Sequence, residues 1–337
     1  MIVLSLRNAR GTALELGGED GVARLLGVTP ALSLQLWNFK AKNPGAGGWR
    51  PLLEQGRAAD EAGVDRLVVS DHVVFGEDLA AYGRPESGGT AGGRQPTGPD
   101  GHWLEPLTLL SVLAGTTRHC RLMTGILIAA LRRPAVLAKA LATLDVLSEG
   151  RVDLGAGVGW QREEYVACGL AFEGRGRLLD QSLEICQTLW RQQRAHYEAE
   201  DLRFEGIHAM PKPLQPGGVP IWVSGTLNKN VLARIVRFGS GWIPWGPDAA
   251  DPAEGLIRVR EALAAAGRDA TSFQVTAQLP IHKDASGRLD LPRSLEPVPA
   301  LQAAGITDFR AGLSLPADPS ATLDTLAPLV TAFRQAT

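Results

Sequence analysis

An alternation of strand-like and helix-like segments runs from residue 31 to the C-terminus, and it constrains the fold more than any other feature of this sequence. Short runs rich in apolar and β-branched residues are typical of buried strands, whereas longer runs with apolar residues three or four positions apart are typical of helices. The expected strands are residues 31–36, 64–70, 121–128, 151–156, 219–224, 241–244, 272–279 and 306–311. The expected helices are residues 50–62, 105–116, 134–147, 178–194, 228–238, 252–266, 295–304 and 320–334.

Strands that are each followed by a helix predict an α/β fold, here a (β/α)8 barrel with insertion segments. Right-handed βα units of this number close into a barrel, whereas an open doubly wound sheet usually has fewer strands. Residues 31–337 are therefore predicted to form a single barrel domain. Residues 1–30 fit no βα unit and are predicted to be an N-terminal extension of uncertain order.

Two segments are too long to be simple connections. Residues 195–214 are expected to be an insertion with a small hairpin, because Tyr197, Leu202 and Phe204 alternate with polar neighbours. Residues 83–101 are rich in glycine and proline, and a loop of this kind is usually a lid over a site or a partly disordered segment.

Composition and charge exclude several classes of protein. The formal net charge of −2 gives no basic surface for nucleic acid, and no apolar run is long enough to span a bilayer. The N-terminus resembles no signal peptide, and the three cysteines (Cys120, Cys168 and Cys186) are typical of small buried residues in a reducing cytoplasm. No cluster of residues has the spacing of a metal site or of a catalytic nucleophile. We expect a cytoplasmic protein that acts on a small molecule.

Ser70-Asp71-His72 ends the second expected strand. In a barrel this position lies at the rim where active sites are built. Histidine titrates near neutrality and can transfer a proton, so Asp71 and His72 are candidate catalytic residues. The alternative interpretation is that Asp71 caps the following turn and His72 packs against it.

Glycines mark the ends of the third and fourth expected strands. Gly125 interrupts the third strand, and Gly155, Gly157 and Gly159 follow one another at every second position. This spacing differs from the G-x-G-x-x-G fingerprint of dinucleotide-binding folds. A backbone without side chains lets a planar ring approach closely, but Gly125 is equally compatible with an ordinary buried strand.

Two further segments carry polar groups toward the same rim. Glu163 and Glu164 are acidic residues at an expected helix N-terminus, where acidic side chains are favoured. Ser224-Gly225-Thr226 is either an anion-binding turn with free amides or an ordinary helix cap. Three tryptophans near the predicted rim are candidates to line an apolar pocket: Trp37, Trp103 and Trp245.

Residues 61–72 (EAGVDRLVVSDH) and 157–165 (GVGWQREEY) resemble segments of the luciferase-like flavin and deazaflavin oxidoreductases. The pattern Leu131-Arg-Arg-Pro134 with Gly157-Val-Gly-Trp160 is most similar to the branch that uses the deazaflavin coenzyme F420. Ser240 stands where the family usually has an aspartate, which is a mild departure. The resemblance implies a (β/α)8 barrel, usually a homodimer, with the cofactor ring at the carboxyl face of the barrel.

The resemblance also implies which residues hold the cofactor. A non-prolyl cis peptide between Gly125 and Ile126 would support the central ring, and Ser224-Gly225-Thr226 would bind the phosphate. The full set of implied cofactor contacts is Gly125, Ile126, Leu127, Gly157, Gly159, Glu163, Ser224, Gly225 and Thr226.

The function implied by the resemblance is hydride transfer between F420 and a small organic substrate. His72 would exchange the accompanying proton, and Asp71 would orient His72 or bond to the ring. The sugar-phosphate dehydrogenases of the family have a glutamate where this chain has Trp160, which favours an apolar substrate. Two alternatives remain open. One is a two-component monooxygenase that binds FMN and draws on a separate flavin reductase; the other is a catalytically silent cofactor-binding protein.

Overall fold

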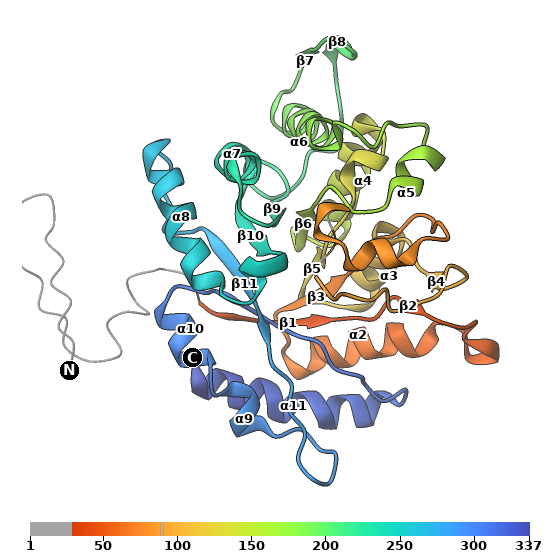
Figure 1. Cartoon of the computed structure of the whole chain (residues 1–337), viewed down its shortest axis with the longest axis vertical. Helices are drawn as coiled ribbons and strands as arrows, with labels where there is room; N and C mark the ends of the chain where they lie inside the picture. Colours follow the sequence, from red (N-terminus) through yellow and green to blue (C-terminus); the bar gives the residue numbers. More distant parts are fainter. Residues whose placement is uncertain (1–28, 88, 90) are drawn as a thin grey trace, which may run out of the picture.

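Eight parallel strands form a closed barrel in the computed structural model, which describes residues 29–87, 89 and 91–337. The strands pair in the order β1-β3-β5-β6-β9-β10-β11-β12, and β12 pairs with β1 (Figure 1). Their bounds are β1 Ala31–Gln35, β3 Arg66–Val69, β5 Arg121–Thr124, β6 Val152–Ala156, β9 Ile221–Gly225, β10 Gly241–Pro244, β11 Gln274–Leu279 and β12 Asp308–Ala311. The predicted (β/α)8 barrel is confirmed. The extension predicted for residues 1–30 lies, up to residue 28, outside the described residues.

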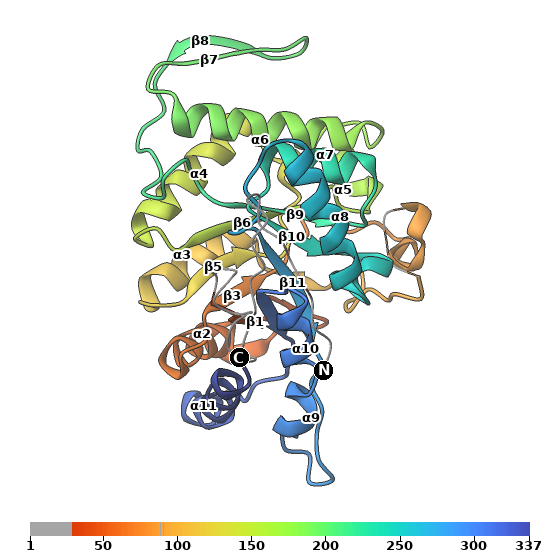
Figure 2. The same cartoon turned by 90° about the vertical axis from the view of Figure 1, so that its left-hand side faces the viewer.

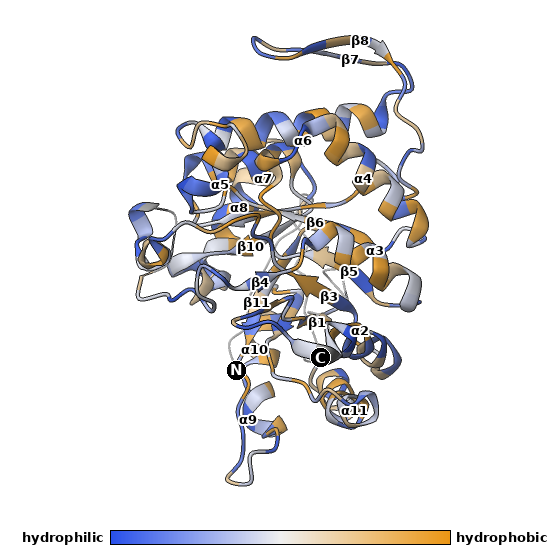
Figure 3. Ribbon diagram, turned by 90° about the vertical axis from the view of Figure 1, so that its right-hand side faces the viewer, coloured by the Kyte–Doolittle hydropathy of each residue, from blue (hydrophilic) through white to orange (hydrophobic). Residues whose placement is uncertain are grey.

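Helices surround the barrel, with bounds close to those expected. They are α2 Arg50–Ala62, α3 Pro106–Thr116, α4 Pro134–Leu147, α5 Arg162–Ala167, α6 Arg175–Arg191, α7 Lys229–Phe238, α8 Pro252–Ala265, α9 Leu291–Leu295, α10 Val298–Ala303 and α11 Pro319–Ala336. In Figure 3, α6 carries both hydrophilic and hydrophobic residues, as expected for a helix with one face on the core. Prolines in the first turn and glycines after the last turn fixed several of these limits.

One expected helix is wrong in its limits. Residues 295–304 were expected to be one helix, but the structure has two short helices, α9 and α10, on either side of Glu296 and Pro297. A proline has no backbone N–H and restricts the residue before it, so Pro297 ends one helix and starts the next. The small pair β2 (Phe39–Lys40) and β4 (His102–Trp103) was also not expected.

The predicted insertion at residues 195–214 contains the expected hairpin. Strands β7 (Ala195–Glu198) and β8 (Arg203–Ile207) pair in antiparallel fashion. The rings of Tyr197 and Phe204 lie 5.7 Å apart across the pair. Figure 2 shows this hairpin beyond α6, away from the barrel.

The amino-terminal half of the barrel interior holds a buried ionic network. The Arg66 guanidinium donates to Asp153 at 3.1 Å and also to Asp308. Asp308 accepts a further hydrogen bond from Thr276 at 2.8 Å, and Arg121 donates to Asp153 at 2.7 Å. Burial alone would raise the pKa of Asp153, but Arg66 and Arg121 together lower it below its ordinary value. The Asp153 carboxylate therefore stays ionised, and the network links the five strands β3, β5, β6, β11 and β12.

An apolar layer closes the barrel above this network. It consists of Val68, Met123, Trp222 and Ile243, which are buried together. The Arg66 guanidinium lies under the Trp222 ring, 4.7 Å from the ring centroid. Because this layer fills the barrel, a cavity at the carboxyl ends of the strands has a closed floor.

The glycine spacing at the end of β6 follows from packing against the end of β5. A Cβ on Gly155 would lie 2.0 Å from the Thr124 carbonyl oxygen, and one on Gly157 would lie 2.9 Å from Ile126 Cδ1. A Cβ on Gly159 would similarly lie 3.0 Å from the side chain of Ile128. Gly155, Gly157 and Gly159 at the end of β6 therefore face, in the same order, Thr124, Ile126 and Ile128 at the end of β5. These glycines make room for neighbouring residues of the chain, which the sequence alone did not indicate.

Replacing Gly155 by alanine is expected to lower the free energy of unfolding by about 2 kcal/mol or more, because the blocking atom belongs to the backbone. The matched control is G115A in α3, where nothing lies within 4 Å of the added Cβ. G115A should leave stability unchanged or raise it by about 0.5–1 kcal/mol. Denaturant unfolding followed by circular dichroism measures both variants. Equal stability of G155A and G115A would contradict the packing explanation.

Candidate active site at the carboxyl end of the barrel

A cavity of about 360 Å³ opens at the carboxyl ends of the strands. This volume is within the range of small-molecule sites. The aromatic side chains that line it are Trp37, Phe39, Tyr82, Trp103, Trp160 and Trp245, and the polar ones include Gln35, Gln95, Gln278 and Arg310. The prediction that Trp37, Trp103 and Trp245 line an apolar pocket is confirmed.

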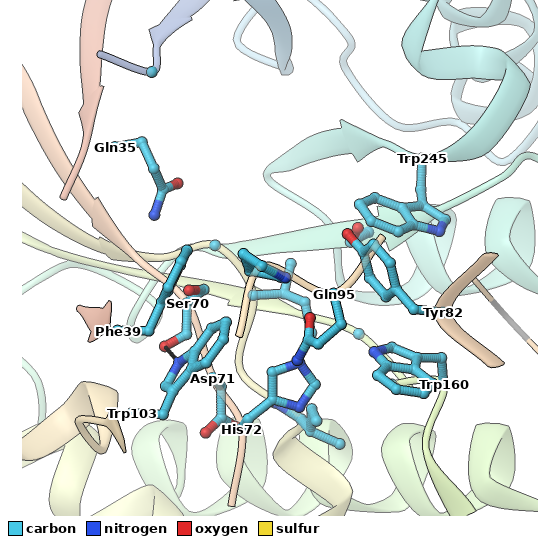
Figure 4. Close-up of a pocket in the computed structure, with 18 of the residues that line it drawn as sticks. Gln35, Phe39, Ser70, Asp71, His72, Tyr82, Gln95, Trp103, Trp160 and Trp245 are labelled. Atoms are coloured by element: carbon cyan, nitrogen blue, oxygen red, sulfur yellow. Dashed lines mark hydrogen bonds between the residues drawn. The ribbon is translucent and has the colours of Figure 1, made fainter. Parts of the chain in front are cut away.

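His72 lies among aromatic rings on the wall of this cavity. Its imidazole centroid is 4.8 Å from that of Trp103, 4.7 Å from that of Phe75 and 5.8 Å from that of Trp160. Figure 4 shows His72 between Trp103 and Trp160, with Tyr82 and Trp245 farther along the same wall. Flat apolar walls with few hydrogen-bonding groups favour a planar ligand.

Two buried amide side chains hold the segment that carries His72. Asn38 donates to the carbonyl oxygen of Ser70 at 2.8 Å and accepts from its backbone N–H at 3.0 Å. Gln161 donates to the Val74 carbonyl oxygen at 2.8 Å and accepts from the Gly76 N–H at 2.7 Å. The backbone on both sides of His72 is therefore fixed.

Asp71 does not face His72. Its buried carboxylate accepts two hydrogen bonds from Arg132, one of them at 2.9 Å, and another from the Ile128 N–H at 2.9 Å. Burial raises the pKa of Asp71 although Arg132 opposes the shift. Burial would lower the pKa of Arg132, but its hydrogen bonds and ion pair with Asp71 raise this pKa above its ordinary value. Asp71 lines the cavity wall (Figure 4). Its carboxylate anchors Ile128 and Arg132, so the expectation that Asp71 orients His72 does not match this geometry.

Glu164 is the carboxylate that faces His72. Its Oε1 lies 3.3 Å from His72 Nδ1 and accepts a hydrogen bond from the Val73 N–H at 2.8 Å. The Glu164 side chain is fully buried, and neither its Oε2 nor His72 Nδ1 makes a hydrogen bond within the described part of the chain. This contact leaves Nε2 as the imidazole nitrogen away from the carboxylate. The sequence favoured Glu163 over Glu164, because the resemblance placed a polar cofactor contact at Glu163, whereas the structure turns Glu164 toward His72.

Six of the nine predicted cofactor contacts line the cavity and three do not. Gly125, Ile126, Gly157, Gly159, Ser224 and Gly225 line it, and the peptide bond between Gly125 and Ile126 is cis, as expected. Leu127 is fully buried and bridges to Ala156. Glu163 and Thr226 are exposed and lie outside the cavity wall.

The turn after β9 has both paired and free amides, because the N–H groups of Thr226, Asn228 and Lys229 donate no hydrogen bond within the described residues. The Leu227 N–H donates to Asp248 at 2.5 Å, and the Asn228 side chain accepts from the amides of Asn230 and Val231. The cap at the start of α7 is thus supplied by Asn228. The amides of residues 158–160, in the turn after β6, likewise donate no hydrogen bond within the described residues.

The cysteines agree with the expectation of reduced and mostly buried thiols. Cys120 and Cys186 are buried and Cys168 is half-buried, all as free thiols. Within the described ranges no group of three histidine, cysteine or acidic side chains has the arrangement of a metal site. Among the helices of the same residues, none is both long and apolar enough to cross a membrane.

The fold and the cavity define a (β/α)8 barrel with a ligand site at the face where barrel enzymes carry their active sites. Residues 33–287 match the family model described as luciferase-like monooxygenase, and the chain belongs to this family. This finding confirms the resemblance seen in the motifs.

Sequence relatives include proteins named for the deazaflavin. The F420-dependent glucose-6-phosphate dehydrogenase of Mycolicibacterium smegmatis is 30% identical over 285 residues, which is 82% of this chain and 73% of the relative. An uncharacterized protein of Mycobacterium tuberculosis is 36% identical over 166 residues, 49% of this chain, and the match spans only 58% of that relative.

Solved structures support the fold. The monooxygenase RslO1 from Streptomyces bottropensis has a TM-score of 0.63 at 22% identity, covering 89% of this chain and 98% of RslO1. An F420-dependent secondary alcohol dehydrogenase, solved with an F420-acetone adduct, has a TM-score of 0.66 at 16% identity. That match covers 91% of this chain and 99% of the dehydrogenase.

Replacing Arg132 by alanine is expected to cost about 3–5 kcal/mol near neutral pH, because Asp71 would remain buried without its partner. Without Arg132, burial raises the pKa of Asp71 still further above its unfolded value. The loss of stability caused by R132A is therefore present at pH values above the pKa of Asp71 in the unfolded chain. It is relieved as the pH falls through the raised pKa of Asp71 in the folded protein, where the carboxyl group takes up a proton. Urea unfolding at about pH 5 and about pH 8 measures this change.

The double variant D71N/R132A is the control for this effect. Removing the charge should recover part of the lost stability at the higher pH. The explanation would be contradicted if R132A lost the same stability at both pH values, or if the double variant recovered none of it. Either result would show that the Asp71 carboxylate is not buried and ionised in R132A at the higher pH.

Proposed function

We propose that this chain is an oxidoreductase that transfers a hydride between the deazaflavin F420 and a small apolar organic substrate. Family membership and the F420-dependent relatives support the general assignment to flavin- or deazaflavin-using oxidoreductases. The observation that carries the proposal is the aromatic cavity in which His72 is backed by the buried Glu164.

The residues of the cavity fit a flat tricyclic ring. Ile126 forms one wall, and Trp103 and Trp160 supply aromatic surfaces on either side of His72. The unpaired amides of residues 158–160 offer donors to the polar part of the cofactor. When bound, F420 would supply the chemistry of hydride transfer at its central ring.

His72 is the proposed proton-transfer residue. An imidazole donates through one nitrogen and accepts through the other, and Glu164 is placed to fix which nitrogen does which. Since Nδ1 lies against Glu164, Nε2 would exchange the proton with the substrate. Gln95 and Pro96, from the segment 83–101 expected to be a lid, line the cavity together with Tyr82, so this part of the chain would limit the access of water.

The apolar substrate follows from Trp160 and its surroundings. Trp160 occupies the position of a glutamate in the sugar-phosphate dehydrogenases that the sequence resembles, and only 6% of its surface is exposed. A buried indole next to Tyr82 disfavours a polyhydroxylated substrate, whose hydroxyl groups need partners. The homodimer implied by the resemblance remains a prediction.

Titration of the apoprotein with F420 should quench tryptophan fluorescence and shift the visible absorbance of F420, because several tryptophans line the cavity. We expect F420 to bind at least about tenfold more tightly than FMN. Tighter binding of FMN would instead favour the two-component monooxygenase. Failure of both to bind would contradict the proposal, and binding of F420 without turnover of any substrate would favour a silent binding protein.

Glu163 and Glu164 provide a matched pair of variants. E164Q and H72A should keep F420 binding but lower the rate of F420 reduction by a panel of apolar alcohols by about 100-fold, the usual contribution of general acid–base catalysis. E163Q should resemble the wild type, because Glu163 is exposed. An effect of E163Q as large as that of E164Q, or unchanged rates in H72A, would remove the proposed proton path.

A further inference from the structure

The floor of the cavity carries a charged side chain that the proposed reaction does not use. Arg310 is on β12, two positions beyond Asp308 of the buried ionic network, and so points into the barrel one layer nearer the carboxyl end. It lines the cavity with only 5% of its surface exposed. Its Nη1 lies 3.0 Å from the position that a Cβ on Gly125 would take, directly below the wall that contains Ile126.

Arg310 has no acidic partner within 4.0 Å among the described residues. Its Nε makes no hydrogen bond there, and its Nη2 contacts only the sulfur of Met123, at 3.9 Å. Asp308, the nearest acid on the same strand, is already bound by Arg66, Ser33 and Thr276. Burial lowers the pKa of the Arg310 guanidinium, but arginine has too high a pKa to lose its proton in a protein.

The other buried arginines of the described chain are all paired. Arg66 is held by two carboxylates, and Arg234 forms an ion pair with Asp180 at 2.5 Å. A buried charge without a partner is strongly unfavourable in a folded protein. Arg310 therefore stands out as a group whose partner belongs to a ligand.

Amide side chains lie beside Arg310 on the two neighbouring strands. Gln278 of β11 is its register partner, and Gln35 of β1 lies two residues beyond Ser33, the register partner on the other side. All three side chains line the cavity, and the amide of Gln35 points into its open space (Figure 4). A guanidinium flanked by amides is suited to a planar carboxylate, which arginine binds with two parallel hydrogen bonds.

We propose that Arg310, assisted by Gln35 and Gln278, is a subsite for a carboxylate on the substrate. This inference rests on the proposed function and refines it: the substrate would be an apolar or aromatic acid, with its carboxylate on the cavity floor and its apolar part among the aromatic side chains. The same anionic chemistry could come from the pyrimidine ring of the cofactor, so the test must separate these two sources.

Benzoate and its neutral analogue benzamide separate charge recognition from ring binding. Tryptophan fluorescence of the cofactor-free protein reports binding of either compound. We expect benzoate to bind at least about tenfold more tightly than benzamide, and the R310M variant to lose this preference. R310K should retain part of it, because lysine keeps the charge but not the two-pronged geometry.

Stability gives a second readout that does not depend on any ligand. R310M should unfold at a higher temperature than the wild type, because it removes an unpaired buried charge. The matched control is R234M, which removes a buried arginine that is paired with Asp180 and is distant in sequence from the floor residues. R234M should unfold at a lower temperature than the wild type and keep the preference for benzoate. A lower unfolding temperature for R310M would show that Arg310 is structural and would overturn the proposal.

Two further outcomes would overturn the proposal in distinguishable ways. If the wild type binds benzoate and benzamide equally while R310M loses F420 affinity, Arg310 serves the cofactor. If R310M keeps the benzoate preference, the carboxylate binds elsewhere. Because the benzoate test uses cofactor-free protein, it can succeed even if F420 fails to bind, so its result is independent of the F420 titration.

Discussion

The contact between the ends of β5 and β6 is the constraint on which the site depends. Thr124, Ile126 and Ile128 need space, and Gly155, Gly157 and Gly159 provide it on the neighbouring strand. If the glycines carried side chains, the β5 extension could not lie flat against β6. Ile126 would then leave the cavity wall, and the Ile128 N–H would lose its position against Asp71. A packing requirement of the barrel thus shapes one side of the cavity.

The barrel interior uses charge differently at its two ends. In the amino-terminal half, Arg66 is compensated by carboxylates, and the apolar layer above it keeps this network away from the cavity. At the carboxyl end, Arg310 lacks such compensation, and Glu164 has one oxygen without a partner. Polar groups that are fully paired hold a fold together, whereas unpaired ones mark the places where a ligand is expected.

Local patterns predicted most of the fold, and long-range contacts determine the part that they missed. Strand and helix periods, with Pro134 and Gly63 near helix ends, gave limits for α2 and α4 that match the structure. Because His72 and Gly125 lie at the carboxyl ends of expected strands, the sequence predicted that both residues lie at the same rim of the barrel. The contact between Glu164 and His72 could not be predicted, because the two residues lie 92 positions apart along the sequence and meet only in the folded protein. Arg310 left one overlooked signal, because it is a second charged residue, two positions after Asp308, in a strand that was expected to be buried.

The central claim is that the aromatic cavity at the carboxyl end of the barrel holds the tricyclic ring of F420. A crystal structure of the protein with F420 bound tests it directly. The ring is expected between Ile126 and His72, with its central portion facing the Nε2 side of the imidazole. A ring bound anywhere else, for example at the amino-terminal end beside Arg121 and Asp153, would show that this cavity is not the cofactor site.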